Sequence, residues 1–174
     1  MPTTRQIIIR ESIKLFQRDG YHGTPVSVIL KAAKIPKGSL YHHFPGGKEE
    51  VASATLKWLT DEITNHLDSL DQSNASGDEM LSSLATFQEN LLKDNKEIRG
   101  SLIAVLASEC IPSSARISQE LASTISQIET RLENGFKRQN VATPENSAIR
   151  SIALLEGSFL MSRIKGVSID PSKL

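Results

Sequence analysis

Between Pro36 and Pro45 the chain reads Lys37-Gly38-Ser39-Leu40-Tyr41-His42-His43-Phe44. A proline at each end limits this stretch to about two turns of helix, because proline interrupts a helix from within. A second short helix is predicted just upstream, where Thr24-Pro25 precedes apolar residues at helical spacing, namely Val28, Ile29, Ala32 and Ala33. Two short helices joined by a tight turn are typical of a helix-turn-helix, whose second helix reads duplex DNA.

The residue types of the second helix suit contact with a phosphate backbone. Gly38 lets a phosphate or a base edge approach the helix N-terminus, where free N–H groups favour anions. Lys37 adds a positive charge, Ser39 a short hydrogen-bond donor and Tyr41 a rigid hydroxyl. The alternative is that Tyr41 and Phe44 only pack a small helical head, with Lys37 as a solvated turn residue.

Outside this stretch, every strongly patterned segment has apolar residues at three- and four-residue steps, and no alternating segment is bounded by hairpin turns. The chain is therefore predicted to be all-α. Thr3 or Thr4 is expected to cap a first helix that Gly20 ends as a left-handed residue, and Thr24 to cap the next. Further helices are expected at 48–70, 80–93, 101–110, 114–140 and 144–165, with a polar loop at 71–77 and an irregular segment at 95–100.

The first three helices occupy fewer than fifty residues and cannot bury much apolar surface alone. A long helix from Lys48 to Leu70 carries an apolar stripe, so it is predicted to join these helices to the rest of the chain. The predicted organisation is a helix-turn-helix domain over residues 1–47, called the head, and a helical domain over residues 48–174, called the body.

Charge is unevenly spread along the chain. The 174 residues carry 20 basic and 20 acidic side chains, yet residues 1–50 hold eight basic and four acidic ones, a net charge of +4. A basic head on an acidic body suggests a polyanionic partner, and a chance excess on a solvated face is the alternative. The single cysteine excludes a disulfide within the chain, and no apolar run nears the roughly 18 residues of a membrane span. A cytoplasmic protein is the expectation.

The head resembles the TetR family of one-component transcriptional regulators. The matching residues are Gly20-Tyr21-His22-Gly23-Thr24, Lys37-Gly38-Ser39-Leu40-Tyr41-His42-His43-Phe44 and Lys48-Glu49-Glu50-Val51. The spelling Phe44-Pro45-Gly46-Gly47-Lys48-Glu49-Glu50 is similar to the subgroup that includes the LmrA- and YxaF-type repressors. The resemblance implies a DNA-binding head, a ligand-binding and dimerisation body, and a homodimer that leaves a pseudo-palindromic operator when a small molecule binds.

Carried over by position, the resemblance implies contacts with operator DNA by Thr24, Ser27, Lys37, Gly38, Ser39, Tyr41, His42 and Lys48. Two departures affect the turn before the second short helix. The family usually has glycine where this chain has Lys34, and a small polar residue is common where it has Pro36. Either departure is expected to shift the recognition helix or its phosphate contacts.

Residues of the body are assigned to an effector cavity from their chemistry alone. The candidates are Trp58, Phe87, Glu109 and Cys110. For the two aromatic residues the alternative is ordinary packing in the core. For Glu109 the alternative is a salt-bridged or surface carboxylate. Cys110 among apolar neighbours favours an inert buried thiol over a redox sensor, because the chain has no second cysteine to resolve an oxidised one.

The last two helices are the expected dimer interface, with Leu154, Gly157, Ser158 and Met161 as candidate contacts. Tight packing within one chain is the alternative for Gly157. We find no metal-ligand spacing, no requirement for a cofactor, and no set of nucleophile, base and orienting group. The alternative function is an all-α adaptor whose basic head binds an acidic protein, and an enzyme ranks third. For a DNA-binding regulator, activation of transcription is the alternative to repression.

Overall fold

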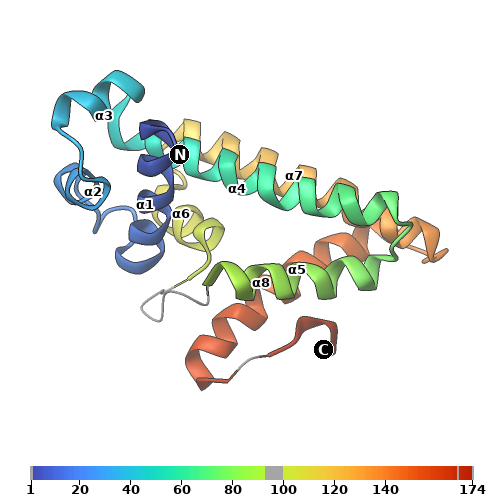
Figure 1. The fold of residues 1–174 in the computed structure, drawn as a ribbon. Helices are drawn as coiled ribbons and strands as arrows, with labels where there is room; N and C mark the ends of the chain where they lie inside the picture. Colours follow the sequence, from blue (N-terminus) through green and yellow to red (C-terminus); the bar gives the residue numbers. More distant parts are fainter. Residues whose placement is uncertain (1, 93–99, 168, 174) are drawn as a thin grey trace. The chain divides into compact units, whose positions relative to one another are not determined.

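The computed structural model describes residues 2–92, 100–167 and 169–173 (Figure 1). These residues form eight α-helices and one 3₁₀ turn and contain no strand, which confirms the all-α prediction. The elements are α1 (Thr4–Asp19), α2 (Val26–Ala33), α3 (Lys37–His43), α4 (Gly47–Gln72), α5 (Gly77–Leu92), α6 (Leu102–Cys110), α7 (Ala115–Arg138), α8 (Pro144–Lys165) and η1 (Pro171–Lys173). Of the irregular segment expected at 95–100, only Gly100 lies within the described residues.

Local hydrogen bonds explain how the first helix begins and ends. The Thr3 hydroxyl accepts the Gln6 N–H at 3.3 Å and the Gln6 side chain accepts the Thr3 N–H at 2.8 Å, which is a complete capping box. At the other end the Gly20 N–H donates to the Phe16 carbonyl at 2.9 Å. Gly20 has φ +85° and ψ 168°, so the predicted left-handed conformation is wrong, although the positive φ still favours glycine.

The left-handed residue of the helix-turn-helix is Lys34. It ends α2 with φ 54° and ψ 45°, and its N–H points back to the carbonyls of Leu30 and Lys31. This is the position where the resembled family usually has glycine, so the lysine adopts the conformation for which glycine is normally chosen. The residue before α3, Pro36, is extended, and α3 then begins at Lys37 as the sequence predicted.

The predicted cap of α2 is wrong. Pro25 occupies the N-cap position without a side-chain hydrogen bond, and the helix begins at Val26. The Thr24 side chain is fully buried, and its hydroxyl donates to the Gly20 carbonyl at 2.7 Å. Thr24 therefore closes the α1–α2 turn instead of capping the helix that follows, because α2 begins one residue later than predicted.

The described residues form two compact units. The first contains residues 2–59 and 100–122, which include α1, α2, α3, α6 and parts of α4 and α7. Its core includes the fully buried side chains of Ile8, Phe16, Ile29, Leu40 and Phe44. In Figure 1 α1 lies across α6, and α1 also contacts α2 and α3. The helix α1 therefore joins α6 to the helix-turn-helix.

The second unit contains residues 60–92, 123–167 and 169–173. Its core includes Leu67, Met80, Leu84, Leu132 and Phe136, and α5 packs against α8 and η1 (Figure 1). Arg131 donates to both carboxylate oxygens of Asp68, at 2.7 and 3.0 Å, which lowers the pKa of that carboxyl below its usual range. The predicted boundary between the head and the body, which lies between residues 47 and 48, stays a prediction.

Candidate nucleic-acid interface

One face of α3 is buried and packs in the core, and the other is exposed and available to a partner. Leu40 is fully buried, whereas Lys37, Gly38 and His42 are exposed and Tyr41 keeps 42 % of its surface accessible. A Cβ built on Gly38 meets nothing within 4 Å, so the backbone at the start of α3 is open to a partner. Ser39 is half-buried.

Of the sequence-predicted contacts on the preceding segment, only Ser27 faces outward. Ser27 lies exposed in the first turn of α2. Thr24, as described above, is buried and hydrogen-bonded to the end of α1. Its side chain therefore shapes the α1–α2 turn from within.

Lys48 is held by the same turn. Its Nζ donates to the Tyr21 carbonyl at 3.0 Å and lies 4.3 Å from the centroid of the Tyr21 ring. Burial lowers the pKa of Lys48 below its ordinary value and raises that of Tyr21. The ammonium group thus pairs with a carbonyl dipole and an aromatic face within the protein, so it orders the turn between α1 and α2.

The other contact that fixes this turn comes from α6. The Glu109 carboxylate accepts the His22 backbone N–H at 2.7 Å, and the His22 Nε2 lies 3.0 Å from the Glu109 carbonyl oxygen. A Cβ at Gly20 would fall 2.2 Å from Glu109 Oε1, so any larger residue there would displace the carboxylate from this position. Glu109 therefore ties α6 to the helix-turn-helix, a role that sequence reasoning missed.

Cys110 is fully buried beside this contact. Burial, with Glu109 as the second cause, raises the pKa of its thiol from 9.0 to about 11. The thiolate is the reactive form of cysteine, and redox-sensing cysteines have a lowered pKa. The environment of Cys110 therefore favours the inert thiol over the sensor.

We expect Cys110 to resist Ellman's reagent at about pH 8 in the folded protein and to react completely once the chain is unfolded. Because folding raises the thiol pKa, this group stabilises the fold fully below the ordinary pKa of 9.0 and loses that contribution as the pH rises toward 11. The absorbance of the coloured thiolate that the reagent releases measures the extent of reaction, with and without denaturant. Fast labelling of the native protein would contradict the assignment.

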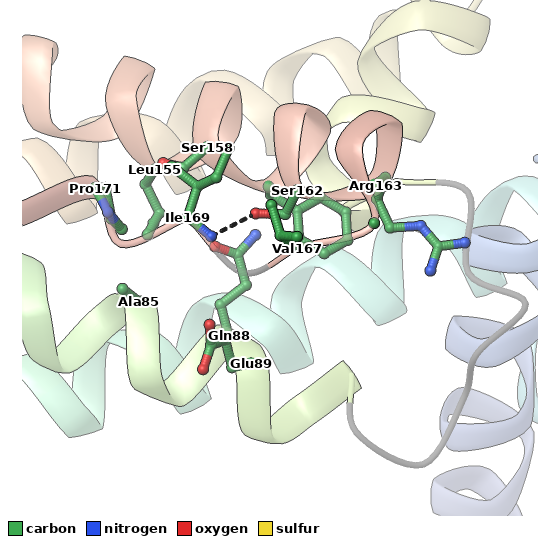
Figure 2. A pocket seen from close by; sticks show the side chains of 12 residues that line it. Ala85, Gln88, Glu89, Leu155, Ser158, Ser162, Arg163, Val167, Ile169 and Pro171 are labelled. Carbon is green, nitrogen blue, oxygen red and sulfur yellow. Dashed lines mark hydrogen bonds between the residues drawn. The ribbon is translucent and has the colours of Figure 1, made fainter. Parts of the chain in front are cut away.

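The second unit contains a cavity of about 430 Å³ between α5, α8 and the residues that follow α8. Figure 2 shows Leu155, Ser158 and Ser162 of α8 on one side and Ala85 and Gln88 of α5 on the other. The Ile169 N–H donates to the Ser162 hydroxyl at 2.9 Å and holds the C-terminal segment across the cavity (Figure 2). This volume is within the range of small-molecule sites.

The four residues predicted to form an effector cavity do not line this one. Trp58, Glu109 and Cys110 belong to the first unit, and Phe87 stacks on the His66 ring at a centroid distance of 5.1 Å. The cavity is instead built by residues that periodicity could not distinguish from ordinary core, chiefly Leu155, Phe159 and Ser162 of α8.

The opposite face of α8 is apolar and exposed. Ile149, Leu160, Met161 and Ile164 keep 53, 55, 40 and 69 % of their surface accessible, and Ala153 and Gly157 between them are exposed as well. We call these six residues the α8 stripe. A Cβ at Gly157 meets nothing within 4 Å, so the alternative of tight packing within one chain is wrong for the described residues. Leu154 is half-buried, and Ser158 is buried and lines the cavity.

Metal and membrane sites receive no support from the part of the chain that the structure describes. No three His, Cys, Asp or Glu side chains gather there in a group that would hold a metal ion. The described helices also lack any segment with the length and apolar character that a bilayer crossing needs.

Residues 8–55 match the sequence family described as bacterial regulatory proteins of the tetR family. The chain is 33 % identical to the uncharacterized HTH-type transcriptional regulator YxaF of Bacillus subtilis, over 94 % of this chain and 82 % of that protein. It is 24 % identical to the HTH-type transcriptional regulator LmrA of the same organism, over 91 and 86 %. A TetR transcriptional regulator from Legionella pneumophila has the same fold, with a TM-score of 0.86, 24 % identity and coverage of 95 and 90 %.

Proposed function

The chain belongs to the TetR family of helix-turn-helix transcriptional regulators, and from this premise we propose that it is a repressor that binds a pseudo-palindromic operator as a homodimer and is released by a small molecule. The family consists of regulators, which sets aside both an enzyme and an adaptor without a DNA role. Its place of action is the bacterial cytoplasm, where the operator lies.

The observation that carries the DNA-binding part is the division of α3 into a buried and an exposed face. Leu40 anchors the helix, while Lys37, Gly38, Tyr41 and His42 face outward. Lys37 and Tyr41 supply phosphate contacts, and the open backbone at Gly38 admits close approach. The two ring nitrogens of His42 provide hydrogen-bonding groups for a base edge or a phosphate. Ser27 and Ser39 are further short donors at the edges of this surface.

Thr24 and Lys48 support the same interface from within. Both side chains bond to the α1–α2 turn, through the Gly20 and Tyr21 carbonyls respectively. Their proposed contribution to DNA binding is therefore to fix the turn that presents α2, with Lys48 also adding a positive charge near the flanking phosphate.

The α8 stripe supports the homodimer. An apolar helical face of this length is expensive to leave in water and is expected to be covered by the same face of a second copy about a twofold axis. Gly157 lets the two helices approach closely, and Met161 packs beside it. Leu154 borders the stripe, and Ser158 belongs to the cavity side of the same helix.

The cavity beneath α8 is the proposed effector site. Its walls combine the apolar side chains of Leu155 and Phe159 with the amide of Gln88 and the hydroxyl of Ser162, which suits a small amphipathic molecule. The same helix forms the cavity wall and the dimer surface, so an occupant can favour one arrangement of the dimer. A coupling of about 1–3 kcal/mol changes operator affinity roughly 5- to 150-fold.

The proposal is tested by the salt dependence of binding to duplex DNA. For Lys37→Ala we expect weaker binding to every duplex sequence and a slope of log affinity against log salt reduced by about one for each head. Lys57→Ala is the matched control, because Lys57 is also an exposed lysine but lies on α4. Fluorescence anisotropy between about 50 and 200 mM salt measures the slopes.

A wild-type chain whose affinity for duplex DNA does not change with salt would overturn the proposed function. An unchanged slope in Lys37→Ala, with a salt-dependent wild type, would remove Lys37 from the phosphate contacts and leave the function standing.

A further inference from the structure

The positively charged side chain of Arg5 lies beside α3, where it contacts the ring of Phe44 at the end of that helix. Its guanidinium carbon lies 5.1 Å from the centroid of the Phe44 ring. Phe44 is fully buried and occupies the C-cap position of α3, so the location of its ring is fixed by the core. Arg5 itself is exposed. A guanidinium that covers an aromatic face can keep its in-plane N–H donors available to a second partner.

Arg5 gains no stabilisation from the helix dipole of α1. It lies in the first turn, where the helix dipole disfavours a positive charge, and that turn contains no acidic residue. Among the described residues no carboxylate lies within ion-pair distance of Arg5, so its charge is not neutralised there.

Two other cations of α1 are neutralised locally. Lys14 pairs with Glu11 at 2.9 Å, and Arg18 pairs with Asp19 at 2.6 Å. Both pairs join close neighbours along the chain and are partly exposed to solvent. Arg5 therefore differs from them in having an aromatic ring for a support and no anion for a partner in the described part of the chain.

We propose that Arg5 binds a phosphate of the DNA backbone at the edge of the major groove that α3 enters. This inference rests on the proposed function, because it assumes that α3 lies in the groove. The C-terminal end of α3 then approaches one of the two strands that border the groove, and the Phe44 ring holds the guanidinium at that end. A guanidinium pairs with phosphate through two parallel N–H donors, so the fixed orientation of Arg5 favours the contact.

The test compares Arg5→Ala with Lys14→Ala in full-length protein, using duplex DNA of random sequence at several salt concentrations. Both variants remove one positive charge from an exposed side chain of α1, so a general effect of net charge would be equal in the two. For Arg5→Ala we expect the salt slope to fall by about 0.9 for each head, whereas Lys14→Ala should keep the wild-type slope.

Arg5→Lys separates the phosphate contact from a structural role. It keeps the charge and is expected to keep the slope, although it loses the planar contact with Phe44. Thermal unfolding of each variant reports on folding. Equal slopes for wild type and Arg5→Ala, or equal losses in Arg5→Ala and Lys14→Ala, would overturn the assignment of Arg5 alone. A wild type without salt-dependent binding would overturn this assignment together with the proposed function.

Discussion

Leu160→Glu is expected to convert the proposed dimer into monomers and to lower affinity for operator DNA by about 100-fold or more. Leu160 keeps 55 % of its surface exposed in the single chain and lies in the middle of the α8 stripe. In a twofold dimer the substitution places two carboxylates in one apolar contact, where an unpaired buried charge costs several kcal/mol. A monomer presents one α3 to DNA, so the gain in affinity from two linked heads is lost.

Asn65→Glu is the matched control for this substitution. It adds the same charge at an exposed helical position, on α4 instead of α8. Sedimentation velocity measures the mass of each variant, and anisotropy with an operator duplex measures affinity. A Leu160→Glu chain that remains dimeric and binds as tightly as wild type would show that the α8 stripe is not the interface.

Phe44→Ala and Tyr41→Ala are expected to fail in opposite ways, although both remove an aromatic ring from the same short segment. Phe44 is fully buried, so its truncation should destabilise the fold by about 3–5 kcal/mol through lost burial and a cavity. That loss is a large part of the roughly 5–15 kcal/mol that typically holds a folded protein together. Tyr41 keeps 42 % of its surface exposed, so its truncation should change stability little and weaken DNA binding.

Chemical denaturation and DNA binding, measured on the same two variants, separate these outcomes. Tyr41→Phe is the control for the hydroxyl, because it keeps the ring and removes only the group that is proposed to contact a phosphate. Substantial unfolding of Tyr41→Ala, or unimpaired DNA binding by a folded Tyr41→Ala, would show that the exposed face of α3 has been assigned incorrectly.

The head could be predicted because its determinants are local. A buried leucine next to an exposed tyrosine follows from helical spacing, and prolines and capping residues limit each helix to within a few residues of its observed ends. One local rule failed even though the partners are close in sequence. Thr24 has the residue type of a helix cap, yet its hydroxyl donates to the carbonyl of Gly20, four residues earlier, and Pro25 occupies the N-cap position of α2.

The body was harder to predict because its contacts join remote parts of the chain. Glu109 and His22 are 87 positions apart, and nothing in either local sequence indicates that a carboxylate on α6 binds a turn of the head. The helix α8 is apolar on both faces, with Leu155 and Phe159 toward the cavity and Leu160 and Ile164 outward. Helical periodicity assigns one buried face, so it cannot tell a cavity wall from a dimer surface when both are apolar.

Selection of bound sequences from a library of random duplexes tests most directly whether this chain is a sequence-specific dimeric regulator. Two copies of α3 related by a twofold axis should enrich a pseudo-palindrome, with half-site centres about 34–36 Å apart or at a multiple of that spacing. Leu160→Glu should recover no such symmetry under the same conditions. Enrichment of no sequence by the wild-type chain, or of a single asymmetric half-site, would contradict an operator-binding homodimer.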